Sequence, residues 1–328
     1  MGILRLGGNG NNKIALSHTH AMRTAFSHEV YTPLSPKAKG VPPPDENTQR
    51  RSGIRPNPGW RQENQEAALP DTPFDGKSAL VTGAGSGMGL AHATLLAERG
   101  ATVLIQDIEP ERTHAAADAV KAAGGSAVPL VCDAADTAAL RAGIAAFAAD
   151  HGAIGILVNN AGISGRQTPF EEIDEAFFDR MLAVHVKAAF FASQAVTAGM
   201  RAMGWGRIIN ISSMFAMKGS PDAAHYTTAK GALLGLTKAL ARELAPWGIT
   251  VNAIAPGLVE TEMTTISLSG RQGDARAEFD KRAELTPLKR LATPRDLAYA
   301  VAFLASDEAA LMTGQTVSPN GGDAIVGI

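Results

Sequence analysis

The apolar positions of this chain follow two alternating patterns from residue 75 onward. Short runs rich in β-branched residues alternate with longer stretches in which apolar residues recur at helical spacing. The short runs predict strands at Ser78–Thr82, Thr102–Gln106, Ala127–Val131, Ile154–Asn159, Arg207–Ile211, Ile249–Ala255 and Gln315–Ser318. The longer stretches predict helices at Gly87–Arg99, Pro110–Ala123, Thr137–His151, Glu171–Met203, His225–Pro246 and Pro294–Ser306.

Nearly continuous apolar strands separated by helices indicate a parallel sheet that helices cover on both faces. We therefore predict an α/β fold, a doubly wound Rossmann-type three-layer sandwich with seven parallel strands. Residues 71–328 are predicted to form this single domain.

The composition changes near residue 70. The preceding stretch is rich in Pro, Asn, Gln and Arg and has no sustained apolar period. Such a segment buries too little apolar surface to offset chain entropy, so we expect residues 1–70 to be mostly disordered. Three other interpretations stay open: a targeting peptide, because Glu29 is the first acidic residue; a partner-binding tail; and a start codon assigned too far upstream.

Composition and charge exclude several classes of partner. The formal net charge of -2 gives the chain no strong attraction to nucleic acid or anionic lipid. No apolar run reaches the roughly 18 residues that a membrane span needs, so no membrane partner is expected. The only cysteine is Cys132, which excludes an intramolecular disulfide and favours a reducing, cytoplasmic location. His18, His20 and His28 form no recognised metal-binding spacing, and no metal is expected.

A glycine-rich loop follows the first predicted strand and opens the first predicted helix. It reads Gly83-Ala84-Gly85-Ser86-Gly87-Met88-Gly89. Glycines let a backbone approach a pyrophosphate closely, and a helix N-terminus supplies N–H donors and the positive end of a dipole. Alone, the loop fits a tight strand-to-helix connection equally well. The alternating strands and helices around it favour a dinucleotide.

Asp107 ends the second predicted strand, eighteen residues after Gly89. A carboxylate there can accept hydrogen bonds from both adenosine ribose hydroxyls and repels a 2′-phosphate. Neither Ser86 nor the following Ile108 and Glu109 offers a positive charge to that phosphate. We therefore predict NAD, with NADP the weaker alternative. A helix-capping or loop aspartate is the competing interpretation of Asp107.

Tyr226 and Lys230 lie four residues apart in a predicted helix, on the same face and one turn apart. A nearby ammonium favours the phenolate form of a tyrosine, which suits proton exchange with an alcohol or carbonyl. The pair alone is weak, because a half-buried tyrosine beside a solvated lysine is common. The glycine loop, Asp107 and Ser213, thirteen residues before Tyr226, favour a catalytic interpretation.

With these residues placed, residues 74–322 resemble the short-chain dehydrogenase/reductase family. The family's Thr-Gly-x-x-x-Gly-x-Gly loop matches Thr82 to Gly89, and its Asn-Asn-Ala-Gly motif matches Asn159 to Gly162. Its catalytic Ser, Tyr and Lys match Ser213, Tyr226 and Lys230. The resemblance implies a cofactor site made of Gly83, Ser86, Gly87, Met88, Gly89, Asp107, Asp133, Ala134, Asn160, Ala161, Gly162, Tyr226, Lys230, Pro256, Gly257, Val259 and Thr261.

Within that site, the resemblance implies that Asp133 contacts adenine and that the Val259 backbone and the Thr261 hydroxyl hold the nicotinamide carboxamide. It also implies hydride transfer between substrate and nicotinamide C4. Ser213 would then bind the substrate oxygen and Tyr226 would transfer the proton. Lys230 would grip the nicotinamide ribose, and with the oxidised ring it would favour the tyrosine phenolate.

The chain departs from the family at His185, which stands where the family has an asparagine that holds a water linking the lysine to solvent. A histidine nitrogen can bond the same water and titrates near neutral pH. We propose His185 as a proton-relay residue, and a packed helix histidine is the alternative of equal weight.

The resemblance leaves the substrate open. The leading expectation is an NAD-dependent oxidoreductase for a secondary alcohol or ketone; a 3-oxoacyl-thioester reductase and a dinucleotide-sensing regulator without turnover are the alternatives. Residues 261–287 are expected to form the substrate lid. Its apolar side chains could contact a hydrophobic substrate and its basic ones an acidic carrier; solvated helix charges are the competing interpretation. These residues are Met263, Ile266, Leu268, Phe279, Arg271, Arg276 and Lys281.

Small residues on two predicted helices are expected to be exposed, and relatives commonly pair through these helices. A homodimer or homotetramer is therefore expected. The residues are Ala188, Ala192, Ala195, Gly231 and Gly235.

Overall fold

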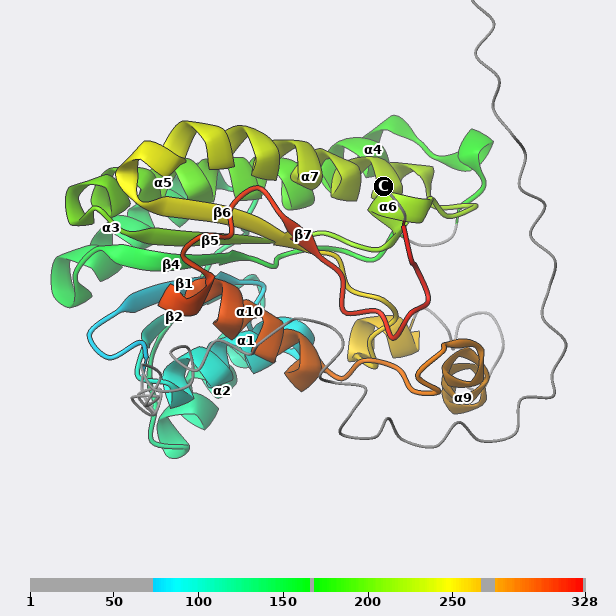
Figure 1. Ribbon diagram of the computed structural model, residues 1–328, viewed down its shortest axis with the longest axis horizontal. Coiled ribbons are helices and arrows are strands. Elements are labelled where there is room, and N and C mark those ends of the chain that lie inside the picture. The colour runs from blue at the N-terminus through cyan, green and yellow to red at the C-terminus, as the bar shows by residue number, and fades with distance from the viewer. Residues whose placement is uncertain (1–72, 166–167, 267–274, 327–328) are drawn as a thin grey trace, which may run out of the picture. The chain divides into compact units, whose positions relative to one another are not determined.

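The computed structural model describes residues 73–165, 168–266 and 275–326 (Figure 1). The predicted N-terminal extension, residues 1–70, lies outside the described residues. The strands are β1 Ser78–Thr82, β2 Thr102–Asp107, β3 Ser126–Val131, β4 Ile154–Asn159, β5 Gly206–Ile211, β6 Ile249–Ile254 and β7 Thr316–Val317. They form one parallel sheet in the order β3-β2-β1-β4-β5-β6-β7.

The main helices cover the two faces of this sheet or lie beyond one end of its strands (Figure 1). They are α1 Gly87–Glu98, α2 Pro110–Ala122, α3 Thr137–His151, α4 Glu175–Leu182, α5 Ala188–Met203, α6 Phe215–Lys218, α7 Ala224–Leu244, α9 Ala275–Leu285 and α10 Pro294–Ala305. Helices α1, α2 and α10 cover one face, and α3, α5 and α7 cover the other. The predicted doubly wound three-layer sandwich is confirmed, and the strand ends differ by at most one residue from those expected.

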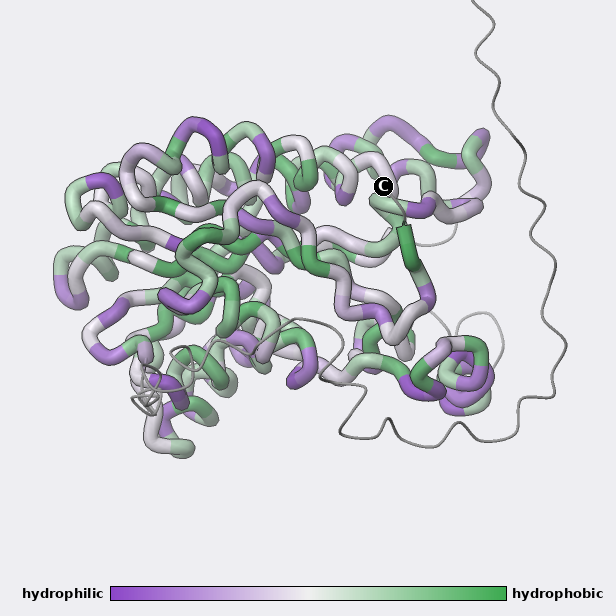
Figure 2. Tube along the Cα trace, viewed as in Figure 1, coloured by the Kyte–Doolittle hydropathy of each residue, from purple (hydrophilic) through white to green (hydrophobic). Residues whose placement is uncertain are grey.

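Alternating strand residues divide the core into two layers. Val81, Ile105 and Val158 pack toward α1, α2 and α10. Their neighbours Leu80, Leu104 and Leu157 pack toward α3, α5 and α7. Successive strand side chains point to opposite faces, so a strand that is apolar throughout must be covered on both sides. Figure 2 shows this concentration of hydrophobic residues along the central strands.

The sheet order reverses between β1 and β4, which pair in parallel. Ligands of doubly wound folds bind at such a reversal, beyond the carboxyl ends of the strands. The loops after Thr82 and Asn159 meet there, which places the glycine-rich loop beside the Asn-Asn-Ala-Gly motif.

The predicted helix Glu171–Met203 is wrong in detail. A short 3₁₀ turn, Phe170–Glu172, precedes α4, and a π-helical segment, Ala183–Lys187, separates α4 from α5. Periodicity could not reveal this segment, because one widened turn barely disturbs an otherwise helical pattern. It contains His185.

The stretch Glu175–Met203 is long and apolar enough to cross a membrane by length and composition, contrary to the expectation from sequence. Its α5 portion packs on β4 and β5 and beside α3. Val196 and Met200 belong to the core between α5 and the sheet. The α5 portion of the stretch is therefore part of the core of this fold.

Two of the small residues expected on the surface are buried. Ala188 and Ala192 are 3% and 0% exposed, because this face of α5 packs into the fold. Gly231 and Gly235 on α7 have nothing within 4 Å of the position that a Cβ would take, so that part of α7 does face open space.

Candidate active site and cofactor groove

The glycine-rich loop is pressed against the end of β4. Gly83 and Gly87 have φ angles of +62° and +56°, a region that favours glycine. A Cβ on Gly83 would lie 2.8 Å from Ala161 Cα, and one on Gly89 would lie 2.6 Å from Asn160 Nδ2 and overlap the Gly83 carbonyl oxygen. Only glycines fit here, and the backbone amides at the start of α1 remain available to an anion.

Hydrogen bonds from Asn160 and Thr82 fix the reversal point. Thr82 Oγ1 accepts from the backbone N–H groups of Asn160 and Ala161, at 3.0 Å each. Asn160 Nδ2 donates to the carbonyls of Thr82 and Gly83, at 2.9 and 3.0 Å. The loops after β1 and β4 are therefore held as one unit.

Asp107 lies at the end of β2 beside this loop. Its Oδ2 accepts a hydrogen bond of 2.9 Å from the Gly85 N–H, and its Oδ1 accepts from the N–H groups of Ile108 and Glu109 at 2.8 and 3.2 Å. A Cβ on Gly85 would lie 2.9 Å from Asp107 Cγ and 3.1 Å from Arg112 Cβ. The structure thus places Asp107 beside the glycine-rich loop. Arg112 of α2 lies there too, and it was not identified from the sequence.

Asp133 follows β3 and pairs with Arg180 of α4, Nη1 to Oδ2, at 2.7 Å. Burial raises the pKa of Asp133, but hydrogen bonds from Arg180 and the Ala135 N–H and the Arg180 charge outweigh it, leaving that pKa lowered. Asp133 is consequently an anion at neutral pH. The adjacent Ala134 is buried at 5% exposure.

Ser213, Tyr226 and Lys230 converge at the carboxyl end of β5. Ser213 follows the strand, and the other two residues lie on the first turns of α7. The Ser213 side chain acts on Tyr226 and lowers the pKa of its phenol, against the effect of burial. The buried Lys230 Nζ donates to the Ile211 carbonyl at 2.8 Å and lies 5.7 Å from the centre of the Tyr226 ring. The predicted trio is thus brought together in space.

The electrostatics of this trio differ from the expectation. Burial lowers the pKa of Lys230 to about 7, so its charge is partly lost at neutral pH. Burial also raises the pKa of Tyr226, although the Ser213 side chain opposes this. The net effect of the protein's own groups is therefore to raise the pKa of Tyr226. The spacing of Tyr226 and Lys230 had led us to expect a lowered pKa.

His185 lies in the π-helical segment with its ring edge toward Tyr226; the ring centres are 5.6 Å apart at 88°. Its Nε2 lies 3.1 Å from both the N–H and the carbonyl oxygen of Ile163, and its Nδ1 has no partner among the described residues. Burial and the Lys230 charge lower the pKa of His185 well below 6.5, against the Ile163 hydrogen bond. The expectation that His185 titrates near neutral pH is therefore not met.

The segment after β6 packs against the residues that follow β5 and β7. The carbonyl of Pro256 accepts a hydrogen bond of 3.0 Å from the Met214 N–H, and a Cβ on Gly257 would lie 2.9 Å from Asn320 Cα. Val259 is buried, and its carbonyl accepts a 2.7 Å hydrogen bond from Thr264 Oγ1.

The same segment reaches the first turn of α1. Thr261 Cγ2 lies 3.6 Å from the position of a Gly87 Cβ. Ser86, the N-cap residue of α1, makes no side-chain cap bond, and Met88 packs partly buried against the core. The predicted cofactor residues thus lie at the end of β2, on the loops after β1, β3, β4 and β6 and on the first turns of α1 and α7.

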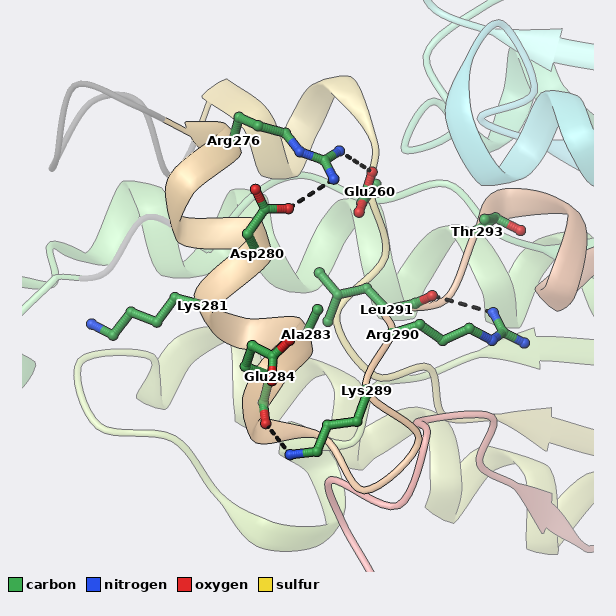
Figure 3. A pocket seen from close by; sticks show the side chains of 10 residues that line it. All are labelled: Glu260, Arg276, Asp280, Lys281, Ala283, Glu284, Lys289, Arg290, Leu291 and Thr293. Carbon is green, nitrogen blue, oxygen red and sulfur yellow. Dashed lines mark hydrogen bonds and ion pairs between the residues drawn. The ribbon is translucent and has the colours of Figure 1, made fainter.

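A separate cavity of about 570 Å³ lies along α9 (Figure 3). Lys289, Arg290 and Leu291 line the side opposite α9, and Glu260, the residue before Thr261, also lines the cavity. Ser213, Tyr226 and Lys230 do not line it. Its charges are largely paired, as with Arg276, which contacts Glu260 at 3.5 Å and Asp280 at 2.7 Å.

The predicted lid is only partly described. Phe279 is buried, whereas Met263 and Ile266 are 47% and 65% exposed. Leu268 and Arg271 lie outside the described residues. Among the residues that the structure describes, no group of three or more His, Cys, Asp or Glu side chains is arranged to hold a metal ion.

Comparisons with known proteins show what this chain is similar to. The model of the enoyl-(acyl carrier protein) reductase family matches residues 83–323. The short-chain reductase protein NovJ of Streptomyces niveus is 40% identical over 244 residues, which cover 74% of this chain and 92% of NovJ. The 3-oxoacyl-[acyl-carrier-protein] reductase FabG of Staphylococcus aureus is 39% identical over 249 residues, which cover 75% of this chain and 97% of FabG.

Solved structures are similar over most of their length. Levodione reductase has a TM-score of 0.73 at 33% identity and covers 76% of this chain and 98% of its own. A Brucella melitensis 3-oxoacyl-[acyl-carrier protein] reductase with bound NAD gives 0.70 at 34%, covering 79% and 95%. A Burkholderia cenocepacia gluconate 5-dehydrogenase with NADP and tartrate gives 0.72 at 37%, covering 79% and 100%.

Proposed function

Since this chain belongs to the short-chain dehydrogenase/reductase family and is an oxidoreductase of CH–OH groups, we propose that it uses NAD to interconvert a secondary alcohol and a ketone. The observation that carries the proposal is the convergence of Ser213, Tyr226 and Lys230 beside the groove. A tyrosine beside a serine hydroxyl, with a buried lysine beneath its ring, can exchange a proton with a substrate oxygen.

The glycine-rich loop suits a dinucleotide because it opens α1, whose first backbone N–H groups can bind a pyrophosphate. The Cβ positions of Gly83 and Gly89 are filled by the Asn160–Ala161 segment and the loop itself, so both residues must be glycine for the loop to pack against the end of β4. A nicotinamide cofactor bound there supplies hydride transfer at its C4 atom. Val259 and Thr261 would hold the nicotinamide carboxamide, and Asp133 would contact adenine.

The acid–base chemistry falls to the trio. Ser213 orients the substrate oxygen, and Tyr226 gives it a proton during reduction or removes one during oxidation. Lys230, buried with a pKa of about 7, holds a proton directly behind the tyrosine. The positive charge of an oxidised nicotinamide ring favours both the phenolate and the neutral lysine, which counters the raised pKa of Tyr226.

NAD is the proposed cofactor because of Asp107. Its carboxylate is fixed beside Gly85, where it can accept hydrogen bonds from the adenosine ribose and repel a 2′-phosphate. Solved relatives hold NAD in one case and NADP in another, so the family leaves the choice open. Comparing kcat/KM with the two cofactors tests the assignment, and equal or better use of NADP overturns it.

His185 is proposed as a relay residue that works as a neutral imidazole. Its buried Nδ1, without a partner among the described residues, can bond a water on the path between Lys230 and solvent. The competing interpretation is a packing histidine that braces Ile163 against the π-helical segment.

Two other functions are kept as alternatives. Reduction of 3-oxoacyl thioesters is favoured by the likeness to FabG. Asp107 weighs only modestly against it, because a solved 3-oxoacyl reductase among the relatives holds NAD. A dinucleotide-sensing regulator without turnover is opposed by the intact trio. We further propose a cytoplasmic homodimer or homotetramer, supported by the open small-residue face at Gly231 and Gly235.

The deciding experiment is NAD reduction by the full chain across secondary alcohols, sugars, steroids and 3-hydroxyacyl thioesters, with NADP alongside. Turnover with NAD supports the proposal, and a Tyr226→Phe variant should then lose about 10²–10⁴ in rate as an acid–base group is removed. Near-normal activity in that variant would refute the role of Tyr226. NAD binding without turnover on any substrate would favour the regulator.

A further inference from the structure

An ion pair joins the start of α2 to the segment after β6. Arg112 lies on the first turn of α2, and Glu262 directly follows Thr261 after β6. Their side chains meet with Nη2 3.0 Å from Oε1, although the residues are 150 positions apart in the chain. This long-range contact has no part in the core.

The neighbours of the pair define where it lies. Arg112 Cβ is 3.1 Å from the position of a Gly85 Cβ, next to Asp107, on the side predicted to hold the adenosine ribose. Glu262 adjoins Thr261, which lies 3.6 Å from the position of a Gly87 Cβ, on the side predicted to hold the nicotinamide. The ion pair therefore joins two segments that flank the glycine-rich loop, one at Gly85 and the other at Gly87.

Two charges joined in this way can act on a bound dinucleotide. A ligand lying between the glycine loop and the pair cannot leave until the pair opens, and Arg112 also compensates the Glu262 carboxylate beside an anionic pyrophosphate. The side chains are 51% and 53% exposed, so water and salt weaken the pair and it can open to admit the ligand.

We propose that Arg112 and Glu262 are positioning residues that close over bound NADH and slow its release. The inference rests on the proposed use of a nicotinamide dinucleotide. An exposed ion pair sets the scale of the effect, so loss of either partner should speed release about two- to five-fold at low salt.

The test is stopped-flow release of NADH from the full chain, followed by nicotinamide fluorescence after displacement with excess NAD. Arg112→Gln and Glu262→Gln should each speed release, and the double variant should release no faster than the faster single. The exchanged pair, Arg112→Glu with Glu262→Arg, should restore slow release, which an effect of either charge alone on the ligand would not. High salt should abolish the difference between wild type and the single variants.

A matched control comes from another exposed ion pair, Arg295 to Glu98, with an N–O distance of 2.6 Å and side chains 43% and 38% exposed. It joins α10 to α1 away from the glycine loop, and Arg295→Gln should leave the release rate unchanged.

Unchanged release in both single variants would overturn the inference. So would slower release in Glu262→Gln, since it would mean that the carboxylate only repels the pyrophosphate. Wild-type protein that binds neither NADH nor NADPH would instead refute the proposed function itself.

Discussion

Gly162 and His185 are packed so closely that adding one methyl group should disturb both. A Cβ at position 162 would lie 2.5 Å from His185 Cε1 and 3.0 Å from Nδ1. The imidazole cannot retreat easily, because it is buried at 2% exposure and its Nε2 is bonded to the backbone of Ile163. A Gly162→Ala variant must therefore shift the histidine or the loop.

The expected cost follows from overpacking. Forcing an extra carbon into a well-packed site costs about 1–3 kcal/mol, and a weakened hydrogen bond to Ile163 adds about 0.5–1.5 kcal/mol. For a domain of this size, each kcal/mol lowers the melting midpoint by about 2–4 °C. We expect a loss of about 1.5–4.5 kcal/mol in the free energy of unfolding, measured by urea denaturation of the cofactor-free chain.

A second substitution identifies the cause. In a His185→Ala background the new methyl group has room, so Gly162→Ala should cost less than about 0.5 kcal/mol there. Gly231→Ala is the matched control for the dissociated chain, because nothing within one chain lies within 4 Å of its Cβ position on α7, and at concentrations too low for assembly it should be neutral or stabilising by up to about 1 kcal/mol. A Gly162→Ala variant as stable as wild type, or an equal cost in both backgrounds, would refute this account of the packing.

Two further predictions concern the ionisable groups behind the tyrosine. Burial lowers the pKa of Lys230 to about 7, from 10.5 in the unfolded chain. Between these two pH values the lysine is protonated in the unfolded chain and neutral in the folded one, so the free energy of unfolding should rise with pH across that window. The wild type should gain about 4–5 kcal/mol relative to Lys230→Met between pH 7 and 10.5 in urea denaturation; a pH-independent difference would contradict a buried, neutralised lysine. His185→Ala should lower kcat by about tenfold or more with KM preserved, and His185→Asn should restore it. Since the pKa of His185 lies well below 6.5, neither variant should move an inflection of the pH profile near neutrality, and unchanged kcat would remove His185 from the proton path.

The strands and the glycine-rich loop could be read from the sequence because their causes are local. A strand buried on both faces must be apolar throughout. Gly83 and Gly89 must be glycine because their Cβ atoms would lie 2.8 Å from Ala161 Cα and 2.6 Å from Asn160 Nδ2. Motif order then identified Ser213, Tyr226 and Lys230, which the fold does bring together.

Tertiary structure decided what depends on burial and on contacts between distant residues. Lys230 was expected to lower the pKa of Tyr226, but both groups are desolvated, and desolvation penalises the charged form of each. Burial likewise keeps His185 from titrating near neutral pH. The contact between Arg112 and Glu262 exists only because the strand order places the loops after β2 and β6 on opposite sides of one groove. The sequence determined the elements and the reactive groups by itself, whereas their pKa values and long-range pairings followed from how the folded chain removes water around them.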